Sequence, residues 1–193
     1  DVYKRQVLQM VSEFRRQDQD TPVVLMGYLN PVEVMGYKEF AASAAAAGVD
    51  GVLTVDIPPE EGHDLVQALK DAELDPIFLA APTSNPYRLK LIAGAGSGFI
   101  YYVSLKGVTG SANLVVDEVA AKLAQIRELS NLPLGVGFGI KDAEMAARMA
   151  KISDAVIVGS ALVSRIEEHR DQPMEINRVL GQLIREMRQA IDA

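Results

Sequence analysis

Short runs of aliphatic and β-branched residues alternate with amphipathic stretches along the whole chain, and this alternation constrains the fold more than any other feature. Six apolar runs predict strands at residues 23–28, 51–55, 76–80, 98–104, 134–137 and 155–158. Helical periodicity predicts intervening helices at 31–47, 62–73, 86–93, 116–129 and 143–149, and a last helix at 176–191. Strands that alternate with helices form parallel sheets covered by helices. The sequence therefore predicts an α/β protein with a parallel sheet.

The number of strands leaves two architectures open. A (β/α)8 barrel (TIM barrel) typically has eight strands in about 250 residues, whereas this chain has 193 residues. It is either an open doubly wound sheet or a barrel with about six of its eight βα units. The helix predicted at 7–14 has no strand before it, which favours a barrel lacking its first two strands. We expect one barrel domain over residues 1–193.

Residues 1–6 carry no helix cap and no periodic pattern. Two interpretations stay open for this segment. It is either a non-native leader, left by cloning or sequence assembly, or a frayed N-terminus.

Composition excludes several classes of function. The chain has no cysteine, two histidines and a net charge of −7. Disulfides, iron–sulfur clusters and thiolate catalysis are excluded, and we expect no metal site. The acidic balance argues against nucleic acid and anionic membranes as partners. No apolar run approaches the roughly 20 residues of a membrane span, and the first residues do not resemble a secretory signal, so we expect a cytoplasmic protein.

Three glycine turns follow predicted strands and predict a phosphate site. They are Gly-Val-Thr-Gly at 107–110, Gly-Phe-Gly at 137–139 and Gly-Ser at 159–160. Glycine lets several backbone N–H groups converge on an anion, and the third turn opens a predicted helix at 161–166 with its positive dipole end. The candidate phosphate-binding residues are Gly110, Gly139, Gly159 and Ser160. A glycine after a strand is also common in plain βα connections, and that alternative stays open for each turn.

Seven blocks of sequence resemble the tryptophan synthase alpha subunit family in order and spacing. They are residues 25–31 (LMGYLNP), 56–61 (DIPPEE), 76–82 (PIFLAAP), 101–104 (YYVS), 107–110 (GVTG), 137–140 (GFGI) and 158–161 (VGSA). The resemblance covers essentially everything after Gln6. It implies a (β/α)8 barrel and a lyase of tryptophan biosynthesis, which cleaves indole-3-glycerol phosphate by a retro-aldol reaction into indole and glyceraldehyde 3-phosphate.

The resemblance also implies a partner and an indole pocket. The indole passes to a beta subunit in an αββα tetramer, and the cofactor PLP belongs to that subunit, so no cofactor is expected in this chain. The residues that match the family's indole pocket are Met26, Tyr28, Leu53, Val55, Leu79, Tyr101, Thr109 and Phe138. A flat apolar ring suits such aliphatic and aromatic groups. The alternative, strongest for Leu53 and Leu79, is that these strand residues simply fill a barrel interior.

No catalytic residue is expected within this chain. The family's general acid/base glutamate and its aspartate that binds the indole N–H match positions before residue 1, so we expect substrate binding with little or no turnover. Asp56 follows a predicted strand and is either a substitute acid/base or, more simply, a cap for nearby N–H groups. Two other hypotheses stay open. One is a different phosphate-binding barrel enzyme, and the other is a non-catalytic module that docks the beta subunit through Asn30, Pro31 and Pro58.

Overall fold

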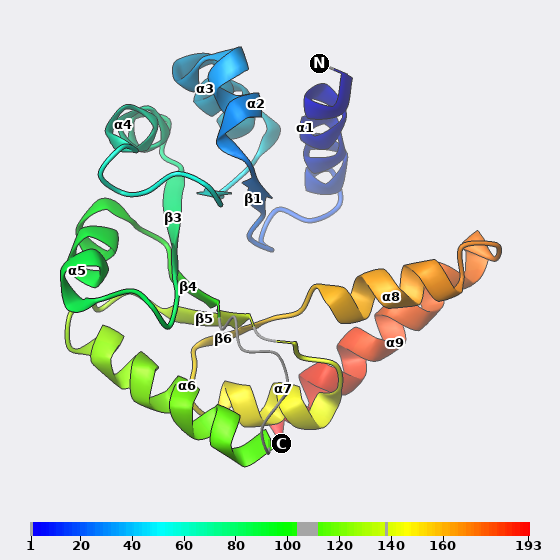
Figure 1. Cartoon of the computed structure of the whole chain (residues 1–193). Coiled ribbons are helices and arrows are strands. Elements are labelled where there is room, and N and C mark those ends of the chain that lie inside the picture. The colour runs from blue at the N-terminus through cyan, green and yellow to red at the C-terminus, as the bar shows by residue number, and fades with distance from the viewer. Residues whose placement is uncertain (1, 104–111, 138) are drawn as a thin grey trace. The chain divides into compact units, whose positions relative to one another are not determined.

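The predicted alternation of strands and helices is confirmed. A computed structural model describes residues 2–103, 112–137 and 139–193 (Figure 1). The elements are α1 (Val2–Arg15), β1 (Val24–Gly27), α2 (Leu29–Met35), α3 (Tyr37–Ala47), β2 (Gly51–Thr54), α4 (His63–Asp71), β3 (Asp75–Ala80), α5 (Pro86–Ala95), β4 (Ile100–Val103), α6 (Ala112–Arg127), β5 (Leu134–Gly137), α7 (Ala143–Ala150), β6 (Ala155–Ile157), α8 (Ser160–Glu168) and α9 (Pro173–Asp192). The strands occur in the sheet in sequence order.

One predicted helix is wrong as drawn. The stretch 31–47 forms two helices, α2 and α3, because Gly36 between them has a φ of +88°, in the left-handed region that interrupts a helix. The alanine-rich α3 then ends at Gly48, which has a left-handed conformation typical of helix C-termini. Helix α1 begins earlier than predicted and already includes residues 2–6.

The chain divides into two compact units, and each is described by itself. Unit 1 comprises residues 1–79 and 85–100. In it, β1 pairs in parallel with β2, and β2 pairs in parallel with β3. Helix α3 packs against α1, α2 and α4, and it does so through small side chains such as Ala41 and Ala44, which are 1% and 0% exposed. The core between these helices and the strands includes Phe40, Val52 and Leu69.

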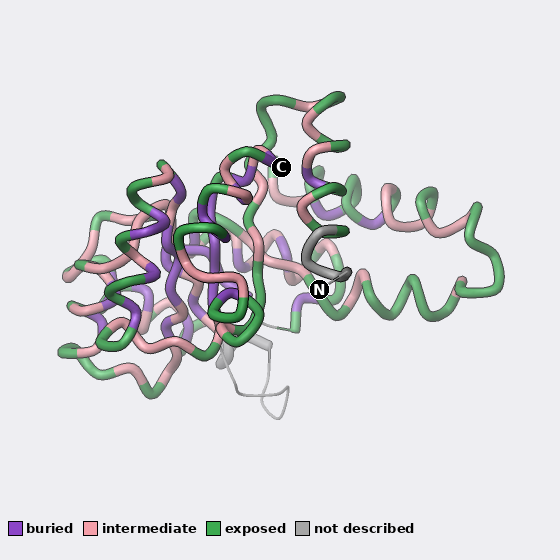
Figure 2. The backbone as a smooth tube through the Cα atoms, turned by 90° about the horizontal axis from the view of Figure 1, so that it is seen from above, coloured by how far each residue is buried: buried purple, intermediate pink, exposed green. Residues whose placement is uncertain are grey.

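Unit 2 comprises residues 80–84 and 101–193. Strands β5 and β6 pair in parallel, and the core contains fully buried Leu123, Leu134 and Met149. Helix α9 packs along α7 and α8. Helix α8 has no buried residue, and α9 buries Leu183 and Met187, one turn apart. Figure 2 shows the α8–α9 pair as mostly exposed and intermediate along its length.

An arginine at the end of α1 ties that helix to the beginning of two strands in unit 1. Arg15 Nε donates to the carbonyl oxygen of Gly48 at 2.7 Å, and Nη2 donates to Asp50 Oδ2 at 2.5 Å. Asp50 Oδ2 also accepts the backbone N–H of Val23 at 2.6 Å, just before β1. The Asp50 N–H in turn donates to the Val23 carbonyl at 2.9 Å. We call this group the Arg15 clamp.

Unit 2 repeats the same arrangement at the beginning of β5 and β6. Arg127, the last residue of α6, donates to the Ile152 carbonyl and to Asp154 Oδ2, both at 3.0 Å. Asp154 Oδ2 accepts the N–H of Leu134 at 2.8 Å, and the Asp154 N–H donates to the Leu134 carbonyl at 3.0 Å. We call this group the Arg127 clamp. In both clamps, a helix-ending arginine and an aspartate join the beginnings of two adjacent strands.

Candidate functional site

Five residues predicted to line the indole pocket share one face of the sheet in unit 1. The register pairs Met26 with Leu53 and Leu53 with Ile77. Side chains alternate between faces along a strand, so Tyr28, Val55 and Leu79 continue the face occupied by Met26 and Leu53. The N–H of Val55 donates to the Gly27 carbonyl at 2.9 Å, which extends the pairing of β1 and β2 past the end of β2.

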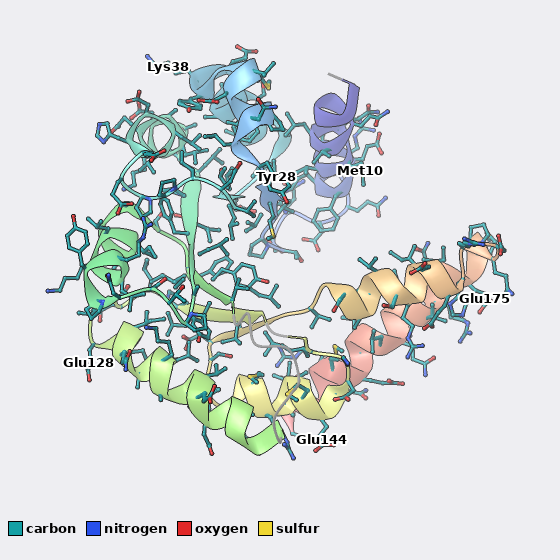
Figure 3. All side chains as sticks on the ribbon, in the orientation of Figure 1. Met10, Tyr28, Lys38, Glu128, Glu144 and Glu175 are labelled. Carbon is teal, nitrogen blue, oxygen red and sulfur yellow. The ribbon has the colours of Figure 1, made fainter. Side chains whose placement is uncertain are left out.

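Three of these residues line one apolar cavity of about 270 Å³. The cavity is lined by Met26, Tyr28 and Leu53, by other residues of β1 and β2 (Val24, Leu25, Gly27, Val52 and Thr54), by Val7 and Leu8 of α1, and by Pro31, Val32 and Phe40 of α2 and α3. Leu53 is 2% exposed, whereas Met26 and Tyr28 are 60% and 67% exposed. Figure 3 labels Tyr28 near the end of β1. The lining in the described part of the chain holds no Asp, Glu, His, Lys or Arg. This cavity is suited to a flat apolar group.

Tyr101 lies on β4 in unit 2, and its ring packs against Gly137 at the end of β5. A Cβ atom at Gly137 would lie 2.5 Å from Tyr101 Cζ and closer still to its phenol oxygen. The tyrosine ring therefore requires glycine at position 137. The sequence alone did not reveal this reason for the glycine. Burial raises the pKa of the Tyr101 phenol above its ordinary value, so the phenol stays protonated and can donate a hydrogen bond.

The glycine turns at 137–139 and 159–160 lie at the carboxyl ends of the adjacent strands β5 and β6 in unit 2. The register pairs Gly137 with Ile157, and each candidate turn lies two residues further along its strand, at Gly139 and Gly159. Gly139 has a φ of +38°, which favours glycine. Gly159 is the N-cap of α8 and has no side chain to bond the helix's first N–H groups, and Ser160 is the first helical residue. Such unbonded N–H groups attract anions.

Three of the predicted site residues, Thr109, Gly110 and Phe138, lie outside the described residues. Within the described residues, no group of three or more His, Cys, Asp or Glu side chains is placed to hold a metal ion. No described helix is long and apolar enough to cross a bilayer.

Asp56 occupies a capping position. Its Oδ1 accepts the backbone N–H of Leu29, the first residue of α2, at 2.7 Å. The interpretation of Asp56 as a cap is therefore confirmed. The sequence did not reveal that the capped N–H belongs to Leu29, which follows the neighbouring strand β1, because this contact depends on how β1 and β2 pair in the sheet.

Comparison with known proteins identifies the family. The family model described as tryptophan synthase alpha chain matches residues 1–192. The tryptophan synthase alpha chain of Thioalkalivibrio sulfidiphilus is 64% identical over 188 residues, which are 97% of this chain and 71% of the relative. That of Nitrosococcus oceani is 59% identical over 97% of this chain and 69% of its own length.

Solved structures agree with the sequence relatives. The tryptophan synthase alpha chain of Legionella pneumophila superposes with a TM-score of 0.88 at 43% identity, covering 98% of this chain and 70% of that one. A chain from the tryptophan synthase a2b2 complex of Pyrococcus furiosus gives a TM-score of 0.85 at 34% identity, covering 95% of this chain and 73% of that one. The fold is accordingly that of a (β/α)8 barrel, with six strands in the described part of this chain, and the chain belongs to the tryptophan synthase alpha chain family.

Proposed function

We propose that this chain supplies the ligand-binding residues of an indole-3-glycerol phosphate lyase. In unit 1, the candidate indole-binding residues are Met26, Tyr28, Leu53, Val55 and Leu79, which share one face of the sheet. In unit 2, the candidate phosphate-binding residues are Gly139, Gly159 and Ser160. The observation that carries the proposal is the strand register, which gathers the apolar residues on one face in unit 1 and the glycine turns at one edge in unit 2.

We further propose that the chain by itself binds this substrate and turns it over slowly or not at all. The retro-aldol cleavage protonates the indole ring and removes a proton from the glycerol hydroxyl, and positioned acid/base groups contribute about 10² to 10⁴-fold to such steps. No carboxylate lines the apolar cavity in the described part of the chain. Asp56 follows β2, but its carboxylate is bonded to the Leu29 N–H.

Binding is tested with each half of the substrate separately. The chain has no tryptophan and six tyrosines, so the fluorescence of added indole reports the ligand when it is excited at wavelengths that tyrosine does not absorb. Met26→Lys places a charge in the cavity and should weaken indole binding at least tenfold while inorganic phosphate binding is unchanged. Gly159→Asp should have the opposite selectivity, because it places a negative charge beside the anion. Each variant is the control for the other. Equal effects on both ligands would contradict the two subsites, and so would no effect.

Turnover is tested with indole-3-glycerol phosphate itself. Cleavage is measured for this chain and for the same chain extended at its N-terminus with the corresponding part of the Thioalkalivibrio sulfidiphilus relative. Turnover by the extended protein alone would support the proposal. Turnover by the unextended chain at the same rate would show that a residue of this chain, with Asp56 as the first candidate, acts as the acid/base.

A second proposed role is docking of a beta subunit, which holds the PLP cofactor. The Pyrococcus furiosus neighbour comes from an a2b2 complex. In this chain, Asn30 and Pro31 are exposed at the beginning of α2, and Pro58 is half-buried in the loop after β2. Docking would be supported if this chain stimulates a purified beta subunit and Asn30→Asp reduces that stimulation. A substitution at exposed Lys38 on α3 should leave the stimulation unchanged.

A further inference from the structure

Asp56 provides the cap of a helix to which it does not belong. Helix α2 begins at Leu29, and its N-cap residue, Tyr28, makes no side-chain hydrogen bond to the helix. The carboxylate of Asp56, which follows β2, accepts the Leu29 N–H instead at 2.7 Å. A carboxylate beside the first N–H groups of a helix is favoured both by the hydrogen bond and by the helix dipole.

The Leu29–Asp56 bond fixes the backbone on the far side of Tyr28. On the near side, the Gly27 carbonyl accepts the Val55 N–H at 2.9 Å. Tyr28 is thus held between two successive links to the end of β2. Its side chain lines the apolar cavity together with Met26 and Pro31, whereas Asp56 is not among the residues that line it. Asp56 therefore acts on the shape of the cavity through the backbone that it anchors.

We propose that Asp56 is a positioning residue for the indole cavity, acting by anchoring Leu29 and so fixing the wall formed by Tyr28. This inference rests on the proposed function of the cavity. It predicts that the side-chain oxygen at position 56 matters more than its charge. Asparagine keeps an oxygen acceptor and should therefore replace aspartate, whereas alanine should not.

The test compares Asp56→Ala and Asp56→Asn in the full chain by two measurements. Hydrogen exchange of the Leu29 amide reports the anchor, and fluorescence titration of indole reports the cavity. D56A should increase Leu29 exchange and weaken indole binding by up to about 10-fold, because the stability of one helix cap sets the upper limit on what the loosened wall can cost the bound ligand. D56N should stay near the original chain in both measurements.

A matched control comes from unit 2. Asp142 caps α7, with its Oδ1 accepting the Met145 N–H at 2.9 Å, so Asp142→Ala removes a comparable cap and should leave both readouts unchanged. Unchanged indole affinity in D56A would overturn the inference. Equal loss in D56N and D56A would also overturn it, because the charge would then be the active feature. If the original chain binds no indole, the proposed function fails and the cavity role fails with it, while Leu29 exchange still decides whether the anchor exists.

Discussion

Replacing Arg15 by alanine is expected to destabilise unit 1 strongly, because one guanidinium joins three separate segments. Besides its bonds to Gly48 and Asp50, Arg15 Nη1 donates to the Thr21 carbonyl at 2.7 Å. The arginine side chain is 12% exposed, so water replaces its bonds poorly, whereas the Asp50 side chain that it leaves behind is 52% exposed and can be solvated. Hydrogen bonds that involve a charged group contribute about 1.5–3 kcal/mol. We expect a loss of about 3 kcal/mol for Arg15→Ala.

The Arg127 clamp provides a control within the same chain. Arg127 and Asp154 have side chains that are 45% and 48% exposed, and the bonds of Arg127 to Ile152 and Asp154 are 3.0 Å long. Exposed ion pairs contribute about 0.2–1 kcal/mol, so Arg127→Ala should cost about 1 kcal/mol. The same substitution in the same motif should thus differ severalfold in its effect, because burial of the guanidinium differs.

Urea unfolding followed by circular dichroism measures both losses, and hydrogen exchange at the Val23 and Leu134 amides assigns each loss to its own clamp. Arg15→Lys serves as a further variant, because it keeps the charge but lacks the planar fork that reaches several acceptors at once. It should recover less than half of the loss. Equal losses for Arg15→Ala and Arg127→Ala would refute the reasoning from burial. Full recovery by lysine would refute the reasoning from geometry.

Three further predictions concern single side chains. Gly137→Ala should cost about 3 kcal/mol by overpacking against the Tyr101 ring, and in a double-mutant cycle with Tyr101→Ala the two losses should fall short of additivity by about 2 kcal/mol. Burial, with a smaller contribution from Glu118, raises the pKa of the Tyr102 phenol. As pH rises, the unfolded chain therefore releases this proton before the folded chain does, and the free energy of unfolding should fall above about pH 10. Urea titrations over this pH range should show a smaller fall for Tyr102→Phe. Gly48→Ala should lower the melting temperature more than Gly36→Ala. Both positions have a positive φ, but a Cβ atom at Gly48 would lie 2.6 Å from Arg15 Cγ, whereas one at Gly36 would meet no atom within 4 Å. Equal shifts in melting temperature would contradict this prediction.

Periodicity predicted the strands well because each is an apolar run bounded by turn residues. Strand β5 was predicted at its observed bounds, and the others lie within a few residues of the prediction. The break at Gly36 was missed because a single glycine within a helical pattern lowers helix propensity without determining where the chain turns. The positive φ at that residue lets the chain turn between α2 and α3, which then pack against each other.

The candidate site was predictable where its residues follow strands and unpredictable where it depends on contact across strands. Met26, Leu53 and Leu79 could be placed on one face because side-chain alternation and parallel pairing are regular. The Leu29–Asp56 bond and the Tyr101–Gly137 contact each join residues from different βα units. Their partners depend on strand register, which a single sequence does not specify. Gly137 shows the consequence, since it was assigned to a phosphate turn although its lack of a side chain makes room for a tyrosine.

The two clamps and the candidate ligand residues lie at opposite ends of the strands, and this separation makes their roles distinguishable. Val23 and Leu134, which the clamps hold, stand at the beginnings of β1 and β5, whereas Tyr28 and Gly139 follow the ends of the same strands. In barrel enzymes, the amino ends of strands serve stability and the carboxyl ends carry ligands. Loss of a clamp should therefore reduce the stability of its own unit and leave ligand affinity of the folded protein unchanged. Substitutions at Met26 or Gly159 should do the reverse. Because each clamp joins one helix to the two strands that follow it, each unit of this chain stabilises its sheet at the amino ends of the strands, away from its candidate ligand residues.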